Sequence, residues 1–176
     1  MNKLRLPLLV FVLWVVGSSV YLYIWAFSDY GYFDKNNQWL GLTEINIASE
    51  VESEQQQSLI IHIRQPGCRC NSYADQHAND LLAGVKSKQI TLSVTEAKGL
   101  NIPVPATPMV AVFSYEQLSS ELDPDKLTLV YAGPYASGPF CAADDSFLPA
   151  VLDGSIDMSG PWFNGGVKAC RCAVAS

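Results

Sequence analysis

The residues best able to do chemistry are five cysteines: Cys68, Cys70, Cys141, Cys170 and Cys172. Four of them form two copies of one triplet, Cys-Arg-Cys, at residues 68–70 and 170–172. In an oxidising compartment such thiols form structural disulfides or carry out thiol–disulfide exchange. Which cysteine pairs with which cannot be deduced from the spacing, so the pairing stays open.

The first triplet stands at a predicted junction between a strand and a helix. Residues 59–63 (Leu-Ile-Ile-His-Ile) form a short apolar run typical of a buried strand, and residues 65–67 (Gln-Pro-Gly) break it. Apolar residues then recur at helical spacing from Tyr73 to Leu81, with Gly84 as a plausible C-cap. A thiolate at the start of a helix is stabilised by the unpaired N–H groups and the helix dipole, which lower its pKa.

The chain from residue 90 to residue 152 continues with further predicted strands and short helices. A second strand is predicted at 90–94, a short helix at about 95–100, a third strand at 109–113, a fourth at 127–131 and a short helix at 146–152. Residues 114–126 are polar and are predicted to be a connection. This order indicates an α/β fold with a mixed sheet that includes an antiparallel edge pair.

The order of elements resembles the thioredoxin-like superfamily over about residues 58–152. The matching pieces are Pro66-Gly67-Cys68-Arg69-Cys70 at the helix start and Thr107-Pro108 before the third strand. The chain also resembles an uncharacterised bacterial family of membrane-anchored thioredoxin-like proteins. The resemblance implies a mixed sheet flanked by helices. It also implies a cis Thr107–Pro108 bond beside the thiols, with Thr107 offering backbone hydrogen bonds to a thiol partner.

Two departures from the superfamily concern its cysteine motif and one of its helices. The usual motif is Cys-x-x-Cys, whereas here a single residue, Arg69, separates the cysteines. The helix before the proline strand is also reduced. A Cys-x-Cys pair can still form a disulfide, and its small ring favours oxidising or isomerising exchange. We predict Cys68 as the attacking thiol and Cys70 as the resolving thiol; Arg69 either favours the thiolate or points into solvent.

The other candidate residues have competing interpretations. Cys170 and Cys172 are relay thiols or structural thiols, and Cys141 is the odd thiol or the partner of a tail cysteine. His62 lies within a strand and is interpreted as a core histidine. His77 either faces the sheet or assists a thiol. All the cysteines could equally form inert bridges.

The N-terminus carries the most apolar segment of the chain. Residues 8–27 are 20 consecutive uncharged residues, which as a helix would span about 30 Å, the thickness of a bilayer's hydrocarbon core. Lys3 and Arg5 precede this run and acids follow it, so the positive-inside tendency places the N-terminus in the cytoplasm. A cleaved signal peptide is the alternative, but the run is longer than the apolar region of a signal. We expect an uncleaved signal-anchor in the bacterial inner membrane, with the C-terminal domain in the periplasm.

The chain is therefore divided into three parts. Residues 1–27 are the cytoplasmic N-terminus and the anchor, 28–57 a tether with a leading strand over 39–47, and 58–176 the domain with its cysteine-bearing tail. The net charge of −6 and the lack of a Lys/Arg cluster argue against nucleic-acid binding. No nucleotide-binding, zincin or serine-hydrolase motif occurs.

Three functions remain. The leading hypothesis is a membrane-anchored thiol–disulfide oxidoreductase without a cofactor or resident metal. Its partners would be cysteine-containing exported proteins or a membrane redox partner. The second is a copper-binding protein, since two Cys-x-Cys pairs are soft ligands suited to Cu(I). The third is a non-catalytic binding module whose bridges are permanent.

Overall fold

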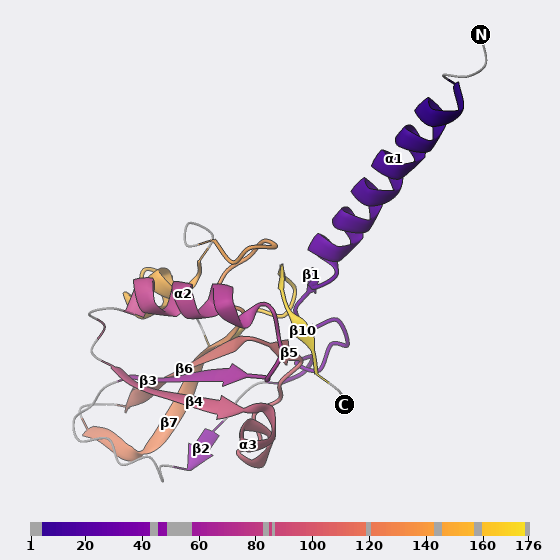
Figure 1. The fold of residues 1–176 in the computed structure, drawn as a ribbon. Coiled ribbons are helices and arrows are strands. Elements are labelled where there is room, and N and C mark those ends of the chain that lie inside the picture. Colours follow the sequence, from indigo (N-terminus) through magenta and orange to yellow (C-terminus); the bar gives the residue numbers. More distant parts are fainter. Residues whose placement is uncertain are drawn as a thin grey trace.

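The computed structural model describes residues 5–42, 46–48, 58–82, 85, 87–118, 121–142, 146–156 and 160–174. Helix α1 (Arg5–Phe27) projects away from the rest of the molecule as a single rod (Figure 1). Its 23 residues would extend about 34 Å, and it is long and apolar enough to cross a membrane. None of its residues is buried in the protein. The helix contains the whole predicted span of residues 8–27.

A mixed sheet forms the centre of the domain. Its strands run in the order β2 (Asn46–Ala48), β7 (Glu121–Gly133), β6 (Met109–Leu118), β3 (Ser58–Arg64) and β4 (Ser87–Ser93), and β8 (Trp162–Phe163) pairs with β7. Strands β3 and β4 are parallel, whereas β6 is antiparallel to both β3 and β7. The predicted α/β class with a mixed sheet is confirmed.

Helices cover both faces of this sheet, and the side chains of the central strands alternate between them. Ile60 of β3 packs on the face covered by α2 (Asn71–Leu82) and α4 (Leu148–Leu152). Ile61 packs on the opposite face, with Ala97 of α3 (Val94–Gly99). This period of two is what a strand buried on both faces requires.

Two small sheets hold the C-terminal tail at the end of the domain where α1 ends (Figure 1). Strand β1 (Tyr30–Tyr32) pairs antiparallel with β9 (Lys168–Cys170). Strand β5 (Ala106–Thr107) pairs antiparallel with β10 (Cys172–Ala173). The Thr107–Pro108 peptide bond that follows β5 is cis, which confirms that expectation.

The predicted connection at 114–126 was wrong. Strands β6 and β7 continue through most of it as an antiparallel hairpin, with Leu118 opposite Glu121. The polar composition is typical of a loop, but backbone pairing between two adjacent segments needs no apolar periodicity. The sequence pattern therefore detected only those parts of both strands that lie over the core.

The segment after the anchor packs on the domain over residues 30–42. Phe33 is fully buried and Trp39 is 5% exposed. Trp39 lies in a turn rather than in the predicted leading strand, because the Asp34 carboxylate accepts hydrogen bonds from the backbone N–H groups of Gln38 and Trp39, each at 2.8 Å. Gly84, the predicted C-cap of the first domain helix, lies outside the described residues.

Candidate thiol–disulfide site

The two Cys-Arg-Cys triplets lie opposite each other and are bonded by two disulfides. Cys68 pairs with Cys172 and Cys70 pairs with Cys170, with Cα–Cα distances of 5.8 and 5.7 Å. The two triplets therefore run antiparallel, each contributing its two cysteines at the same spacing. That repeated spacing is the signal in the sequence that could have suggested the pairing. The cysteines at the helix start are not bonded to each other in this state, and their attacking and resolving roles stay predictions.

The two bridges differ in exposure. Cys70 is fully buried and Cys170 is 6% exposed. Cys68 is 8% exposed, but its partner Cys172 is only half-buried. The Sγ atoms of Cys68, Cys70 and Cys172 all lie within 4.8 Å of one another. Cys172 is therefore the least buried of the four bridged cysteines, and it belongs to the bridge with Cys68.

A tight turn positions the first triplet at the start of α2. The backbone N–H of Cys68 donates to the Gln65 carbonyl at 3.3 Å, and the Asn71 side-chain amide donates to the same oxygen at 2.9 Å. Gly67 has φ +78°, a left-handed conformation that a side chain would strain. The Cys70 carbonyl accepts the Ala74 N–H at 3.1 Å, so α2 starts directly after the triplet.

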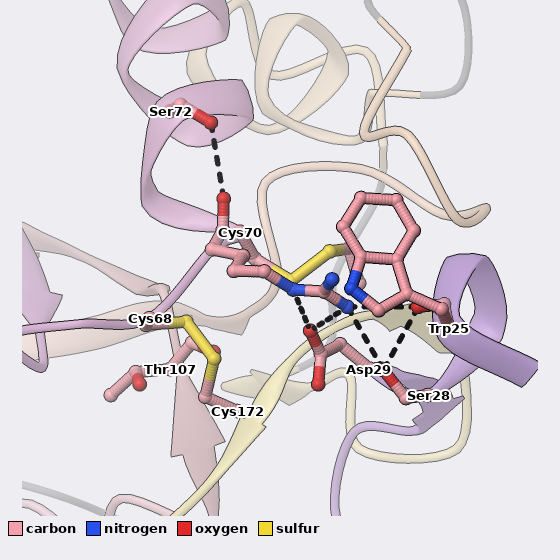
Figure 2. The surroundings of a disulfide bond; sticks show 10 residues. Trp25, Ser28, Asp29, Cys68, Cys70, Ser72, Thr107 and Cys172 are labelled. Atoms are coloured by element: carbon pink, nitrogen blue, oxygen red, sulfur yellow. Dashed lines mark hydrogen bonds and ion pairs between the residues drawn. A yellow bond between two sulfur atoms is a disulfide. The ribbon is translucent and has the colours of Figure 1, made fainter. Parts of the chain in front are cut away.

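The cis-proline segment lies against the more exposed bridge. Cys172 stands opposite Thr107 in the β5–β10 ladder. The Cys68 sulfur lies 3.6 Å from the carbonyl oxygen of Thr107 (Figure 2). Since Cys68 carries no S–H group while it is bonded, this is a contact now and becomes a hydrogen bond once the thiol is released. The predicted neighbours Cys68, Thr107 and Pro108 are thus brought together.

Arg69 connects the first triplet to the C-terminal end of α1 and to the two residues after it. Its partners Trp25, Ser28 and Asp29 are labelled in Figure 2. Its Nε donates to the Asp29 carboxylate at 2.8 Å, and its NH2 group donates to the Trp25 carbonyl at 3.0 Å and the Ser28 hydroxyl at 2.9 Å. The guanidinium also lies over the Trp25 ring, 4.6 Å from its centroid. The Arg69 side chain is still 42% exposed, so it reaches solvent, as one of the two expectations had it, while these contacts hold its guanidinium. Sequence reasoning missed these partners because they lie about 40 residues away.

Asp29 also contacts the second triplet. Its carbonyl oxygen accepts the backbone N–H of Arg171 at 2.7 Å. One residue at the exit of the anchor thus contacts the middle residue of both triplets.

A small hollow lies between the anchor's end and the buried bridge. Its volume is about 220 Å³, and its lining includes Trp25, Tyr30, Tyr73, Phe140 and Cys170. The aromatic rings come from the anchor, β1, α2 and the loop before Cys141. The sulfur-bearing residue Cys170 therefore borders a hollow whose other walls include the anchor's end.

Cys141 is the unbonded cysteine, as expected for the odd thiol. It is 5% exposed, and burial raises the pKa of its thiol to about 11. His77 of α2 is 3% exposed, and its Nδ1 donates to the Cys141 carbonyl at 3.1 Å. The histidine thus faces the core on the Cys141 side.

His62 is a core histidine, as interpreted from the sequence. Its Nδ1 accepts from the Tyr135 hydroxyl at 2.5 Å, and its Nε2 donates to the Gln89 side-chain oxygen at 3.2 Å. Burial is the main cause that lowers the pKa of His62 below its usual 6.5. Its hydrogen bonds involve none of the bridged cysteines.

Comparisons with known proteins place the chain in a family without a described activity. No curated protein matches the chain. No solved structure matches it either. The model of one family, described as a domain of unknown function (DUF6436), matches residues 37–174, which include β2 to β10 and both cysteine triplets. Because that match spans well over half of its residues, the chain belongs to the DUF6436 family.

Proposed function

We propose that this protein is a membrane-anchored thiol–disulfide oxidoreductase. The observation that carries the proposal is the Cys68–Cys172 bridge: Cys172 is the least buried of the four bridged cysteines, and the Cys68 sulfur lies beside a helix start and the Thr107 carbonyl. An accessible disulfide sulfur can be attacked by a thiolate. The Cys68 thiolate that leaves would lie three residues before α2, where the helix dipole favours the anion.

The arrangement of elements supports a thioredoxin-like fold for the domain. Strand β3, helix α2 and the parallel strand β4 follow one another, and the cis proline precedes the antiparallel strands β6 and β7. This is the order that the resemblance implied. The support for this fold comes from the order of the elements and from the position of Pro108 before β6. A fold alone does not determine the activity.

The reaction follows from the oxidised state of the four cysteines. A thiolate of a dithiol substrate attacks the Cys172 sulfur; the Cys68–Cys172 bond breaks and a mixed disulfide forms. The second thiol of the substrate then attacks the substrate sulfur that is bonded to Cys172. This forms the substrate disulfide and releases the Cys172 thiolate. The substrate loses two electrons and gains a disulfide, and the protein gains two thiols.

The proposed location follows from the anchor. Helix α1 would hold the domain at the outer face of the bacterial inner membrane, where disulfides persist. Partners there are exported proteins that carry cysteines, or a membrane redox protein. The contacts of Arg69 with Trp25 and Asp29 would keep the site close to the membrane surface.

Two matched double variants test the proposal on the full chain in detergent. In C68S/C172S the accessible bridge is lost and the buried one is kept; C70S/C170S does the reverse. Incubation with a two-cysteine peptide, followed by mass spectrometry of its disulfide form, should show rapid oxidation by the wild type and by C70S/C170S. Oxidation by C68S/C172S should fall to the uncatalysed rate. Equally rapid oxidation by both double variants would contradict the role of the Cys68–Cys172 bridge, and no oxidation by the wild type would show that the bridges are structural.

A second function is favoured by the sulfur cluster. Among the described residues, Cys68, Cys70 and Cys172 are a group whose sulfur atoms are close enough to hold one metal ion. After reduction these three thiolates would be soft ligands for Cu(I). Binding would then require the reduced protein and would not involve Cys141.

A competition titration distinguishes the two functions. The reduced protein is titrated with Cu(I) in the presence of a colorimetric chelator, with C141S as the matched control for C70S. Binding of one copper ion, lost in C70S and kept in C141S, would support the metal site. Exchange would remain as the function if the reduced form does not take copper from the chelator and the disulfide-bonded form oxidises the peptide.

A further inference from the structure

We infer that the two bridges form an internal relay, in which opening Cys68–Cys172 moves the remaining disulfide to Cys68–Cys70 and leaves both tail cysteines as thiols. This inference rests on the proposed function and deepens it, because it assigns the second bridge a role in the same reaction. The relay would pass reducing equivalents from the half-buried Cys172 to Cys170.

The first argument is distance. The Cys68 and Cys70 sulfurs lie within 4.8 Å of each other while each is bonded to the tail. When Cys68 is released as a thiolate, the nearest electrophile identified at the site is therefore the disulfide of Cys70. A thiolate attacks such a sulfur directly, and an intramolecular attack needs no encounter with a second molecule.

The second argument is whether the new bond can form. Two consecutive Cα–Cα steps of about 3.8 Å limit the separation of residues 68 and 70 to about 7.6 Å. The turn shortens it further, since the Asn71 N–H donates to the Cys68 carbonyl at 3.2 Å. A disulfide requires about 4.4–6.8 Å between Cα atoms, so a Cys68–Cys70 bond is within reach of this turn.

The third argument is that the tail holds its two cysteines differently. Cys170 is part of β9, paired with Tyr30 of β1, and its N–H donates to the Gly138 carbonyl at 3.0 Å. Cys172 is held, apart from its bridge, by the two-residue pairing of β10 with β5. Once its bridge opens, Cys172 can move out with the substrate while Cys170 stays beside Cys70.

The steps balance as follows. A substrate thiolate bonds to Cys172 and displaces the Cys68 thiolate. The Cys68 thiolate bonds to Cys70 and displaces the Cys170 thiolate, which takes a proton from water. The second substrate thiol then displaces Cys172. Two bridges become one bridge and two thiols, and the substrate supplies the two electrons.

The relay also determines where the reduced sulfur appears. Cys170 lines the 220 Å³ hollow together with Trp25 and Tyr30, at the end of the anchor. Cys172, where the electrons enter, is not among the residues that line this hollow. In this relay Cys170 and Cys172, the two cysteines of the second triplet, therefore accept the electrons and end as thiols.

The test maps the thiols of the full-length C141S chain in detergent after one equivalent of the two-cysteine peptide. The reaction is quenched with acid, free thiols are alkylated, and the peptides are identified by mass spectrometry without reduction. The relay predicts alkylated Cys170 and Cys172 and a Cys68–Cys70 disulfide. In the matched control C70S/C170S/C141S, alkylation must appear at Cys68 and Cys172.

The two proposals fail in different ways. Alkylated Cys68 and Cys172 with an intact Cys70–Cys170 bridge, in a chain that oxidises the peptide, would overturn the relay and keep the proposed function. A peptide that stays reduced would overturn both. The wild-type chain, with Cys141 present, is mapped in parallel, so that the result does not depend on how well a variant folds.

Discussion

At the scale of single residues, exposure divides the four bridged cysteines into an accessible and a protected set. Cys172 is half-buried, whereas Cys70 is fully buried. A thiolate must reach the sulfur that it attacks, so access rather than sequence order determines where exchange begins. The proposed entry point is therefore Cys172 in the tail, whereas the sequence predicted Cys68 as the attacking thiol, which stays a prediction.

The buried thiol of Cys141 should be unreactive in the folded protein. Its pKa is raised to about 11 by burial, so at pH 8 almost none of it is thiolate, and its side chain is 5% exposed. We expect negligible labelling by iodoacetamide at about pH 8 in the native, bridged chain, and one label per chain after unfolding without reductant. Rapid labelling of the native chain at Cys141 would contradict the burial described here.

His62 should make the stability depend on pH. Because burial lowers its pKa below 6.5 in the folded state, the unfolded chain binds the proton more readily. The stabilisation is complete above about pH 6.5 and is lost as pH falls through the interval between 6.5 and the lower folded value. Urea unfolding of the wild type and of H62Q, measured from about pH 7 to about pH 5, checks this.

The H62Q variant serves as the control for the other titrating groups, including His77. The free energy of unfolding of the wild type should fall more steeply with decreasing pH than that of H62Q. Parallel curves over this interval would mean that His62 does not titrate differently on folding.

Single residues also show what the sequence could predict of the site. The position of Cys68 at a strand–helix junction follows from local chain order, and the cis bond before Pro108 was implied by the family resemblance; both are confirmed. The contacts of Arg69 with Trp25 and Asp29 join segments about 40 residues apart. No local pattern encodes such a contact.

At the scale of elements, both bridges connect the same two segments. Once Cys70–Cys170 closes a loop of about 100 residues, Cys68–Cys172 closes only a ring of the two triplets. In the chain-entropy description a 100-residue loop contributes about 4.7 kcal/mol, whereas a ring of about six residues contributes about 2 kcal/mol. The stabilisation by the two bridges is therefore not additive.

Removing one bridge should cost much less than half the cost of removing both. We expect C68S/C172S and C70S/C170S each to lose about 2 kcal/mol in the free energy of unfolding, and the variant with all four serines to lose about 7 kcal/mol. Denaturant unfolding of the wild type, the two double variants and the quadruple variant, all with Cys141 unchanged, measures these free energies. A loss in the quadruple variant equal to the sum of the two doubles would contradict the shared-loop arrangement.

The elements differ in how much of them the sequence encodes. Strand β3 and helix α2 carry apolar side chains at their own periods, so both were predicted close to their ends. The hairpin of β6 and β7 was only half found, because its outer part is polar. Strands β5 and β10 have two residues each, and their pairing joins residues far apart in the chain. Such short strands have no period to detect.

At the scale of the whole molecule, the anchor and the domain meet through few contacts. Helix α1 buries none of its own residues, and Arg69 joins it to the domain through a hydrogen bond to the Trp25 carbonyl and a cation–π contact with the Trp25 ring. The apolar run predicted the anchor because a span requires only length and composition. How the anchor meets the domain was not predictable, since that depends on the folded position of the first triplet.

The last prediction concerns the domain without its anchor. A chain that begins at Ser28 keeps Asp29 and both triplets but loses the Trp25 carbonyl and ring as partners of Arg69. Exposed contacts of this kind contribute about 1 kcal/mol or less. We therefore expect this chain to fold in solution with both bridges and to melt within a few degrees of the full chain, as followed by near-UV circular dichroism. The full-length variant R69Q loses these contacts and also those with Ser28 and Asp29, with the anchor still attached, and should shift by a few degrees as well. A truncated chain with scrambled bridges or no cooperative melting, beside a well-folded R69Q, would show instead that α1 supports the fold through contacts other than those of Arg69.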